Sequence, residues 1–267
     1  MKWRCIEVAT RMEPRPLNTS LFDISGRVAV VTGASAGLGR AVASSLVAHG
    51  AKVVGVARRG DDLAAWSSQT DGETAFLASD LSDPAAMPEV AAKAAKPFGP
   101  PDILVNAAGV NTRQHADDVT LAGWHRTLDL NLSAPFFLAQ AFVPAMKEKG
   151  WGRIVNFASL QSERAFASGI AYGASKAGVA QLTRAMAEAW SMHGINANAL
   201  APGFFPTELT APVFDDPDRA AKNAAQTCIG RNGTMDDIVG PTLFLVSPAS
   251  NYVTGQVLYV DGGFTAK

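Results

Sequence analysis

The sequence predicts an α/β fold, with one doubly wound domain built around a mostly parallel sheet of seven strands. Seven short apolar runs, rich in valine and isoleucine, recur after residue 26, and such runs are typical of strands buried on both faces of a parallel sheet. Longer stretches with helical periodicity lie between the runs, which gives the alternation of βαβ units. A glycine cluster follows the first run directly, where folds of this class bind their ligands.

Each element follows from this alternation. The strands are expected, in order, at residues 28–32, 52–57, 74–78, 103–106, 153–158, 196–201 and 256–260. The helical stretches expected between them are 37–49, 84–96, 120–149 with a break at Pro135, and 171–192. A break is expected at Pro135 because proline lacks the N–H group that a helix interior needs.

Length and composition suit a single domain. The chain has 267 residues, of which 48% are apolar and 18% charged, so it can bury an ample core. We place the domain at residues 21–267. Residues 1–20 lack sustained periodicity and the apolar stretch of a signal peptide. We expect them to be a disordered extension or the product of an upstream start codon, with a targeting segment as the alternative.

Charge and cysteine usage exclude several classes of function. The net charge is −1, so we expect no nucleic-acid partner, and the sequence has no apolar run of 18 residues that would suggest a membrane span. Cys5 and Cys228 lie far apart, so we expect no disulfide framework and a cytoplasmic location. The four histidines form no cluster with ligand spacing, so we expect no metal site.

The segment 32–39, Thr-Gly-Ala-Ser-Ala-Gly-Leu-Gly, lies between the first strand and the first helix. Its glycines permit a tight turn and close approach to a pyrophosphate, and the helix N-terminus supplies free N–H groups. In this context the segment predicts a Rossmann-type dinucleotide site. Residues 33–37 also fit the G-x-S-x-G elbow of hydrolases. That elbow needs a late histidine, and His193 instead ends a helical stretch.

The end of the second strand bears on the choice of dinucleotide. An NAD site usually has a carboxylate here for the ribose 2′-hydroxyl, whereas this sequence has Ala57 followed by Arg58 and Arg59. Guanidinium groups suit a 2′-phosphate, so we predict NADP, with NAD as the alternative if the arginines only end the strand in solvent. Asp80 is expected to bond the adenine amino group or to cap the helix near Pro84.

Tyr172 and Lys176 stand at positions i and i+4 of a helical stretch, and Ser159 precedes them at the end of an apolar run. This spacing puts the tyrosine and the lysine on one helix face. An ammonium beside a phenol lowers the tyrosine pKa from its usual value of about 10, which would make Tyr172 a usable general acid or base. The alternative is a surface helix that carries both residues by chance.

Together these pieces resemble the short-chain dehydrogenase/reductase family. The matching motifs, in the family's order, are 32–39, Asp80-Leu81, Asn106-Ala107-Ala108-Gly109, Asn131, Ser159, Tyr172-x-x-x-Lys176 and Pro202-Gly203. The resemblance implies a catalytic tetrad of Asn131, Ser159, Tyr172 and Lys176. The cofactor-binding residues, from the resemblance and from the argument above, are Gly33, Ser35, Gly37, Leu38, Gly39, Arg58, Asp80, Leu81, Asn106, Ala107, Gly109, Tyr172, Lys176, Pro202, Gly203, Phe205 and Thr207. Two residues depart from the pattern: Ala107 replaces a second asparagine, and Ala36 replaces the basic residue of many NADP-using relatives.

The resemblance also implies the chemistry, which is the interconversion of a secondary alcohol and a ketone with NAD(P). Residues 204–230 are expected to form a mobile lid over the cleft, and Arg113 and Gln161 are candidate substrate contacts. The opening segment 21–26 and the closing segment 247–263 resemble those of sugar-acid dehydrogenases, such as gluconate 5-dehydrogenases and 2-deoxygluconate 3-dehydrogenases. A sugar acid or polyol is therefore the expected substrate.

Two other functions remain open at this point. One is a 3-oxoacyl carrier-protein reductase of the same family, which would show a basic patch near the cleft. The other is a non-catalytic dinucleotide-binding regulator, which would show a broken tetrad. The resemblance, with the small and apolar residues of the helical stretches 120–149 and 171–192, predicts a homotetramer, or at least a dimer.

Overall fold

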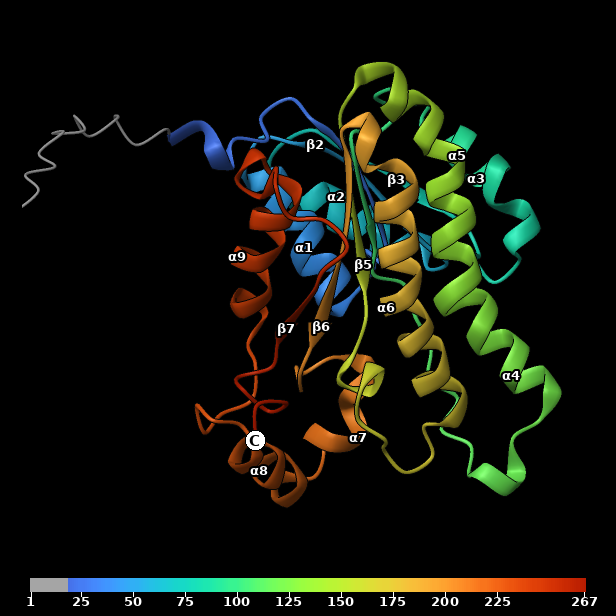
Figure 1. Ribbon diagram of the computed structural model, residues 1–267, viewed down its shortest axis with the longest axis vertical. Helices are drawn as coiled ribbons and strands as arrows, with labels where there is room; N and C mark the ends of the chain where they lie inside the picture. Colours follow the sequence, from blue (N-terminus) through green and yellow to red (C-terminus); the bar gives the residue numbers. More distant parts are fainter. Residues whose placement is uncertain (1–18) are drawn as a thin grey trace, which may run out of the picture.

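The computed structural model describes residues 19–267 as one α/β domain (Figure 1). The seven strands are β1 Val28–Thr32, β2 Lys52–Ala57, β3 Thr74–Ala78, β4 Ile103–Asn106, β5 Gly152–Phe157, β6 Ile195–Pro202 and β7 Val257–Val260. They form one sheet in the order β3-β2-β1-β4-β5-β6-β7, and each neighbouring pair is parallel. The predicted doubly wound fold is therefore confirmed.

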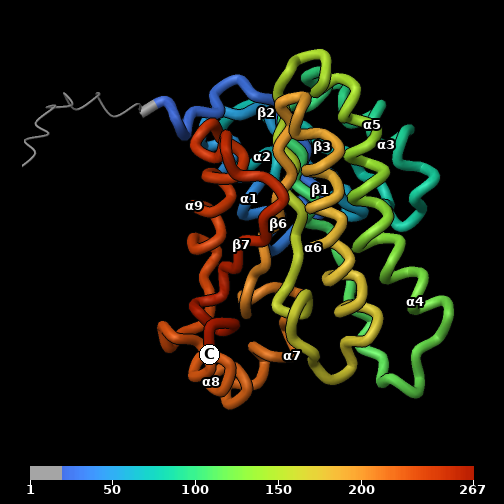
Figure 2. The backbone as a smooth tube through the Cα atoms, viewed as in Figure 1, coloured from blue at the N-terminus to red at the C-terminus, as the bar shows by residue number. Residues whose placement is uncertain are grey.

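The order of the strands locates the site. The chain runs outward from β1 to β3 and then returns to place β4 on the other side of β1. This reversal is the switch point at which folds of this class bind ligands, beyond the carboxyl ends of the strands. Figure 2 shows that the segment after β6, with its short helices, lies at the same end of the molecule as the C-terminus.

The helices cover both faces of the sheet. They are α1 Gly37–Ala48, α2 Gly60–Gln69, α3 Met87–Ala94, α4 Leu121–Leu128, α5 Ala134–Lys149, α6 Ile170–Trp190, α7 Ala211–Phe214, α8 Pro217–Gln226 and α9 Met235–Val246. One core cluster joins the sheet to α1, α2 and α9, and a second joins it to α3, α5 and α6. Successive strand residues alternate between the clusters, as Val30 and Val31 do, because strand side chains point to opposite faces.

The first four strands have the predicted bounds, and the last three differ by one residue at one or both ends. The expected break at Pro135 is wrong, because this proline lies in the first turn of α5, where its missing N–H has no partner to lose. The irregularity lies just before it, in a π-helical turn at Asp129–Ser133. Helices α2, α7, α8 and α9 lie outside the predicted helical stretches.

The segment 1–20, predicted to be a disordered extension, lies outside the described residues except at its last two positions. Among residues 19–267, no helix combines the length and the apolar character that crossing a membrane would need.

Candidate active site

Tyr172 and Lys176 lie one turn apart on the buried face of α6, with exposures of 8% and 4%. The Lys176 Nζ atom is 5.7 Å from the centre of the Tyr172 ring, and it donates a hydrogen bond of 2.6 Å to the carbonyl oxygen of Phe157, the last residue of β5. Ser159 lies two residues after the end of β5, and its side chain is close enough to Tyr172 to lower the pKa of the phenol. The sheet and α6 thus bring the three predicted side chains together.

Burial shifts the pKa of both ionisable groups. It raises the pKa of Tyr172 above its ordinary value, while the hydrogen bond to Ser159 and the charge of Arg113 act in the opposite direction. It lowers the pKa of Lys176 to about 8. The expected net lowering of the tyrosine pKa is therefore wrong for the protein chain by itself, because the cost of ionising a buried phenol outweighs the favourable interactions nearby.

Asn131 lies in the π-helical turn and is 1% exposed. Its Oδ1 accepts a hydrogen bond of 2.8 Å from the Val110 N–H, and its Nδ2 donates to the Val110 carbonyl and to the Ser175 hydroxyl at 2.9 and 3.0 Å. A Cβ atom at Gly109 would lie 3.3 Å from Asn131 Oδ1 and 3.7 Å from Lys176 Nζ. Asn131 therefore ties the loop after β4 to α6, close to Lys176.

The glycine segment after β1 forms a cradle for a phosphate group. Gly33 has a φ of +72°, and a Cβ there would lie 2.9 Å from the Ala108 nitrogen. A Cβ at Gly39 would lie 2.3 Å from the Gly33 carbonyl oxygen. Helix α1 begins at Gly37 after Ala36, and an alanine side chain has nothing with which to satisfy the free N–H groups of the first turn. These groups fit the pyrophosphate of a dinucleotide.

Thr32 joins this cradle to the neighbouring strand. Its Oγ1 accepts hydrogen bonds of 3.1 Å from the N–H groups of both Ala107 and Ala108, which follow β4. The Asn106 side chain turns the other way, with its Nδ2 2.9 Å from Asn156 Oδ1 and 3.4 Å from the Pro135 carbonyl. Asn106 was predicted to contact the cofactor. Because its side chain is occupied by these bonds, it can make that contact only through its backbone.

Two arginines end β2 and differ in their partners. Arg58 is exposed, and its charge helps to lower the pKa of Asp80 against the opposing effect of burial. Arg59 donates to the Ser35 hydroxyl at 3.1 Å and pairs with Glu208 at 2.7 Å and Asp62 at 2.9 Å. Sequence reasoning missed Glu208, which lies 149 positions from Arg59 along the chain and had no signal in the sequence.

Asp80 does not cap the following helical turn. Its Oδ1 accepts a hydrogen bond of 3.0 Å from the Ser82 N–H, whereas the cap of the turn Pro84–Ala86 is Asp83, which accepts from the Ala85 N–H at 3.0 Å. Of the two expectations for Asp80, the capping role therefore belongs to Asp83. The adenine contact stays a prediction.

A comparison of the sequence with models of protein families identifies the family of this chain. The family model described as enoyl-(acyl carrier protein) reductase matches residues 33–265. The chain belongs to the short-chain dehydrogenase/reductase family. The predicted enzyme class, an NAD(P)-dependent short-chain dehydrogenase/reductase, is confirmed.

Three relatives show the range of this similarity. Gluconate 5-dehydrogenase of Gluconobacter oxydans is 38% identical over 248 residues, which are 92% of this chain and 97% of the relative. The 3-oxoacyl-[acyl-carrier-protein] reductase of Escherichia coli is 35% identical over 242 residues, 91% of this chain and 98% of the relative. The crystal structure of a gluconate 5-dehydrogenase from Burkholderia cenocepacia with NADP and tartrate is 35% identical, covers 93% and 98% of the two chains, and has a TM-score of 0.88.

In this short-chain dehydrogenase/reductase the first residues after β6 are held in place by hydrogen bonds and close packing. The Gly203 N–H donates to the Val260 carbonyl at 2.9 Å, and a Cβ at Gly203 would lie 2.8 Å from the Asp261 Cα. The Phe205 side chain is buried in the core, and its carbonyl accepts a hydrogen bond from the Thr210 hydroxyl. Thr207 packs against Gly37, where a Cβ would lie 3.2 Å from its methyl group.

The remaining predicted cofactor residues lie in the core or at the end of a strand. Leu38 packs against the core, Leu81 is buried in the second core cluster, and Pro202 ends β6 beside Val260. These three residues therefore support the site through packing and backbone position.

Arg113 and Gln161 both approach the site. Arg113 donates from Nη2 to the Leu209 carbonyl, and its charge acts on Tyr172. The Gln161 side chain lies against Gly169 and Gly173, at the start of the helix that carries Tyr172. Arg164, another polar residue after Ser159, instead donates to the carbonyl of the last residue, Lys267.

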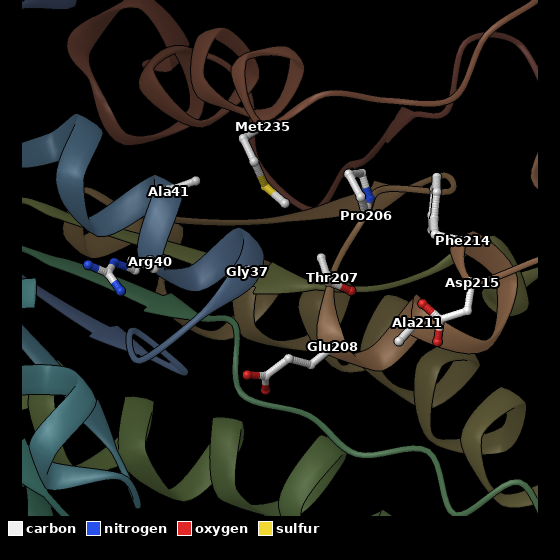
Figure 3. Close-up of a pocket in the computed structure, with 10 residues that line it drawn as sticks. All are labelled: Gly37, Arg40, Ala41, Pro206, Thr207, Glu208, Ala211, Phe214, Asp215 and Met235. Carbon is white, nitrogen blue, oxygen red and sulfur yellow. The ribbon is translucent and has the colours of Figure 1, made fainter.

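A cavity of about 590 Å³ lies between the start of α1 and the segment after β6. Figure 3 shows Gly37 and Thr207 near each other, with Met235 above them between Ala41 and Pro206, and Glu208 below them. The lining of the cavity includes Gly37 and Thr207, two of the predicted cofactor contacts, but neither Tyr172 nor Lys176, which lie on α6.

Proposed function

We propose that this enzyme interconverts a secondary alcohol and a ketone on a sugar acid or polyol, with NADP as the preferred cofactor. The observation that carries the proposal is the convergence of Ser159, Tyr172 and Lys176 beside the glycine cradle at the switch point of the sheet. The names of the gluconate dehydrogenases that this chain resembles support the substrate class. The solved relative with NADP supports the cofactor.

The cofactor fits the residues that surround the cradle. The N–H groups at the start of α1 would hold the pyrophosphate, Arg58 and Arg59 would hold the 2′-phosphate, and Asp80 would bond the adenine. Gly109, Thr207 and Lys176 would line the nicotinamide end. The nicotinamide supplies the hydride chemistry, and the protein supplies position and electrostatic field.

The roles of the tetrad follow from its contacts. Tyr172 donates a proton to the carbonyl oxygen in reduction and takes one from the hydroxyl in oxidation. Ser159, which hydrogen-bonds Tyr172, holds the same substrate oxygen. Lys176 stabilises the phenolate through its charge and binds the nicotinamide ribose. Asn131 positions Lys176 and the loop at Gly109 through its bonds to Val110 and Ser175.

Substrate recognition is assigned to the face opposite the cofactor. Arg113 lies close enough to Tyr172 to act on its pKa, and a guanidinium group there suits the carboxylate of a sugar acid. Gln161 offers an amide to the hydroxyl groups. The segment 204–230 closes over these residues as a lid.

The experiment is a substrate panel read by nicotinamide absorbance. Gluconate, other sugar acids, polyols and 3-oxoacyl thioesters are each assayed with NAD(H) and NADP(H) in the direction that suits them. The proposal expects the highest kcat/KM for a sugar acid or polyol with NADP. A highest value for a 3-oxoacyl thioester would instead assign the enzyme to carrier-protein substrates, as in the relative from Escherichia coli.

Two observations weigh against the alternatives. A carrier-protein reductase would need a basic patch near the cleft, for which Arg113 and Arg164 were the candidates. Arg164 instead donates to the carbonyl of Lys267, so only Arg113 supports such a patch. The complete tetrad argues against a non-catalytic regulator. We also propose a cytoplasmic homotetramer, on the family resemblance and on two exposed apolar side chains, Phe137 on α5 and Ile170 at the start of α6.

A further inference from the structure

Glu208 places a carboxylate where the cofactor site offers donors to an anion. Its Oε1 lies 2.7 Å from Arg59 Nη1, and the other terminal nitrogen of the same guanidinium donates to the Ser35 hydroxyl at 3.1 Å. Ser35 belongs to the glycine cradle and Arg59 ends β2. In the Rossmann-type site this is the end at which the adenosine ribose binds.

Glu208 belongs to the first turn of the lid. Thr207 and Thr210 form a reciprocal cap around this turn, and Arg113, which follows β4, donates to the Leu209 carbonyl. The turn 207–210 is thus held at two points, by Arg59 through a side chain and by Arg113 through the backbone. Both arginines are candidate ligand contacts, so each holds the lid through the guanidinium group that would otherwise bind a ligand.

We infer that Glu208 is an internal substitute for the 2′-phosphate: it latches the lid to Arg59, and the incoming 2′-phosphate displaces it and releases the lid. The inference rests on the proposed use of NADP. It makes Glu208 a determinant of cofactor preference, although the residue lies far in sequence from the end of β2.

The competition favours the phosphate on physical grounds. The Glu208 side chain is 67% exposed and that of Arg59 is 45% exposed, and ion pairs so open to solvent contribute little. A phosphate monoester carries nearly two charges and three strong acceptor oxygens. NAD presents a neutral hydroxyl at the same place, which cannot displace a carboxylate from a guanidinium, so NAD must bind with the latch closed.

The test compares two adenosine fragments that differ only in the 2′-phosphate, 2′,5′-ADP and 5′-AMP. Their affinities are measured by calorimetry, and the lid is followed by amide hydrogen exchange of residues 207–214. We expect 2′,5′-ADP to speed exchange of the lid several-fold in the wild type, and 5′-AMP to leave it unchanged.

The variant Glu208→Gln removes the latch, and Asp62→Asn is the matched control because Asp62 pairs with the same guanidinium at 2.9 Å from α2 rather than from the lid. In Glu208→Gln we expect fast lid exchange without ligand, no further response to 2′,5′-ADP, and about 2- to 5-fold tighter binding of 2′,5′-ADP. The lid of Asp62→Asn should respond as in the wild type.

The outcomes separate the latch from the choice of cofactor. If 2′,5′-ADP binds no tighter than 5′-AMP, the NADP assignment fails and the latch fails with it. If 2′,5′-ADP binds tighter but lid exchange does not respond, or if Glu208→Gln exchanges like the wild type, the latch alone is overturned.

Discussion

The phenol of Tyr172 and the ammonium of Lys176 are both buried, and burial opposes the charged form of each. The protein therefore keeps the tyrosine protonated over a wide range of pH, as a proton donor to a carbonyl must be. The ammonium keeps its charge only below a pKa of about 8. The lysine, rather than the tyrosine, should thus set the upper limit of activity in the reductive direction.

A pH profile tests this assignment. We predict that kcat/KM for ketone reduction falls as the pH rises through about 8, because a base with a lowered pKa loses its proton earlier. The measurement is the initial rate between pH 6 and about 10.5 at saturating reduced cofactor. In Lys176→Arg the residual activity should keep its value to higher pH, since guanidinium stays charged. A profile flat to about pH 9.5 in the wild type would remove the lysine from this role.

The hydroxyl of Tyr172 is predicted to act in proton transfer alone. Tyr172→Phe should lower kcat by about 100- to 10,000-fold, the usual worth of general acid catalysis, and change NADP affinity by only a few-fold. Single-turnover kinetics and calorimetry measure the two quantities separately. Turnover above about a tenth of the wild-type value would contradict the role given to this residue.

The arginines at the end of β2 make separate predictions. Arg58→Ala and Arg59→Ala should each weaken NADP binding by about 10- to 150-fold, the value of one charge-assisted contact of about 1.5–3 kcal/mol, with little effect on NAD. Lys93→Ala is the control, because Lys93 lies on α3 and pairs with Glu89 of the same helix. If both single variants bind NADP like the wild type, the arginines only end a strand in solvent.

At the scale of the element, the sequence was most informative about the sheet. Strands β1, β2 and β4 are apolar runs rich in valine and almost wholly buried, and their bounds are as predicted. The edge strand β3 is more exposed but also has the predicted bounds. Helix α2 was missed because it is short, begins at Gly60 and has two aspartates in its first turn. Helix α9 was missed because it is apolar on most sides and contains Pro241, which hides the periodicity of a surface helix.

The site residues also fall into those that the sequence predicts and those that it does not. Motifs with fixed spacing located the cradle and the tetrad, because local backbone chemistry dictates them. The partners that cross between segments, Glu208 with Arg59 and Arg113 with Leu209, depend on how distant loops pack. No local pattern encodes such contacts, so these pairs became visible only in the structure.

The junction between β1 and β4 supplies a prediction about stability. Thr32→Val removes the acceptor for the N–H groups of Ala107 and Ala108, and it should lower the free energy of unfolding by about 1–3 kcal/mol, as expected for unsatisfied donors. Thr32→Ser keeps the hydroxyl and should recover most of the loss. Urea denaturation followed by circular dichroism measures both. Equal stability of Thr32→Val and the wild type would show that water satisfies these donors.

At the scale of the whole molecule, the two longest helices, α5 and α6, each expose one large apolar side chain. Phe137 on α5 and Ile170 at the start of α6 are 39% and 51% exposed, and Phe136 stacks on Trp190 with ring centres 6.4 Å apart, which fixes α5 against α6. A rigid face of this kind suits burial against a second copy.

Light scattering at micromolar concentration should therefore give the mass of a dimer or a tetramer. We predict that Phe137→Glu shifts the mass toward the monomer, because a carboxylate in an apolar interface is costly to bury. Phe76→Glu, on the edge strand β3 and also exposed, should leave the mass unchanged. A monomeric wild type would rule out the proposed assembly.

The order of the strands also places cofactor selection and catalysis on different parts of the sheet. The ends of β2 and β3 lie on one side of β1, and β5, β6 and β7 lie on the other, so the adenosine end and the tetrad belong to different halves of the molecule. A few substitutions near residues 58 and 208 could therefore switch the enzyme from NADP to NAD during evolution, and so from one cellular pool of reducing power to another. The acid–base apparatus on α6 would pass unchanged through that transition.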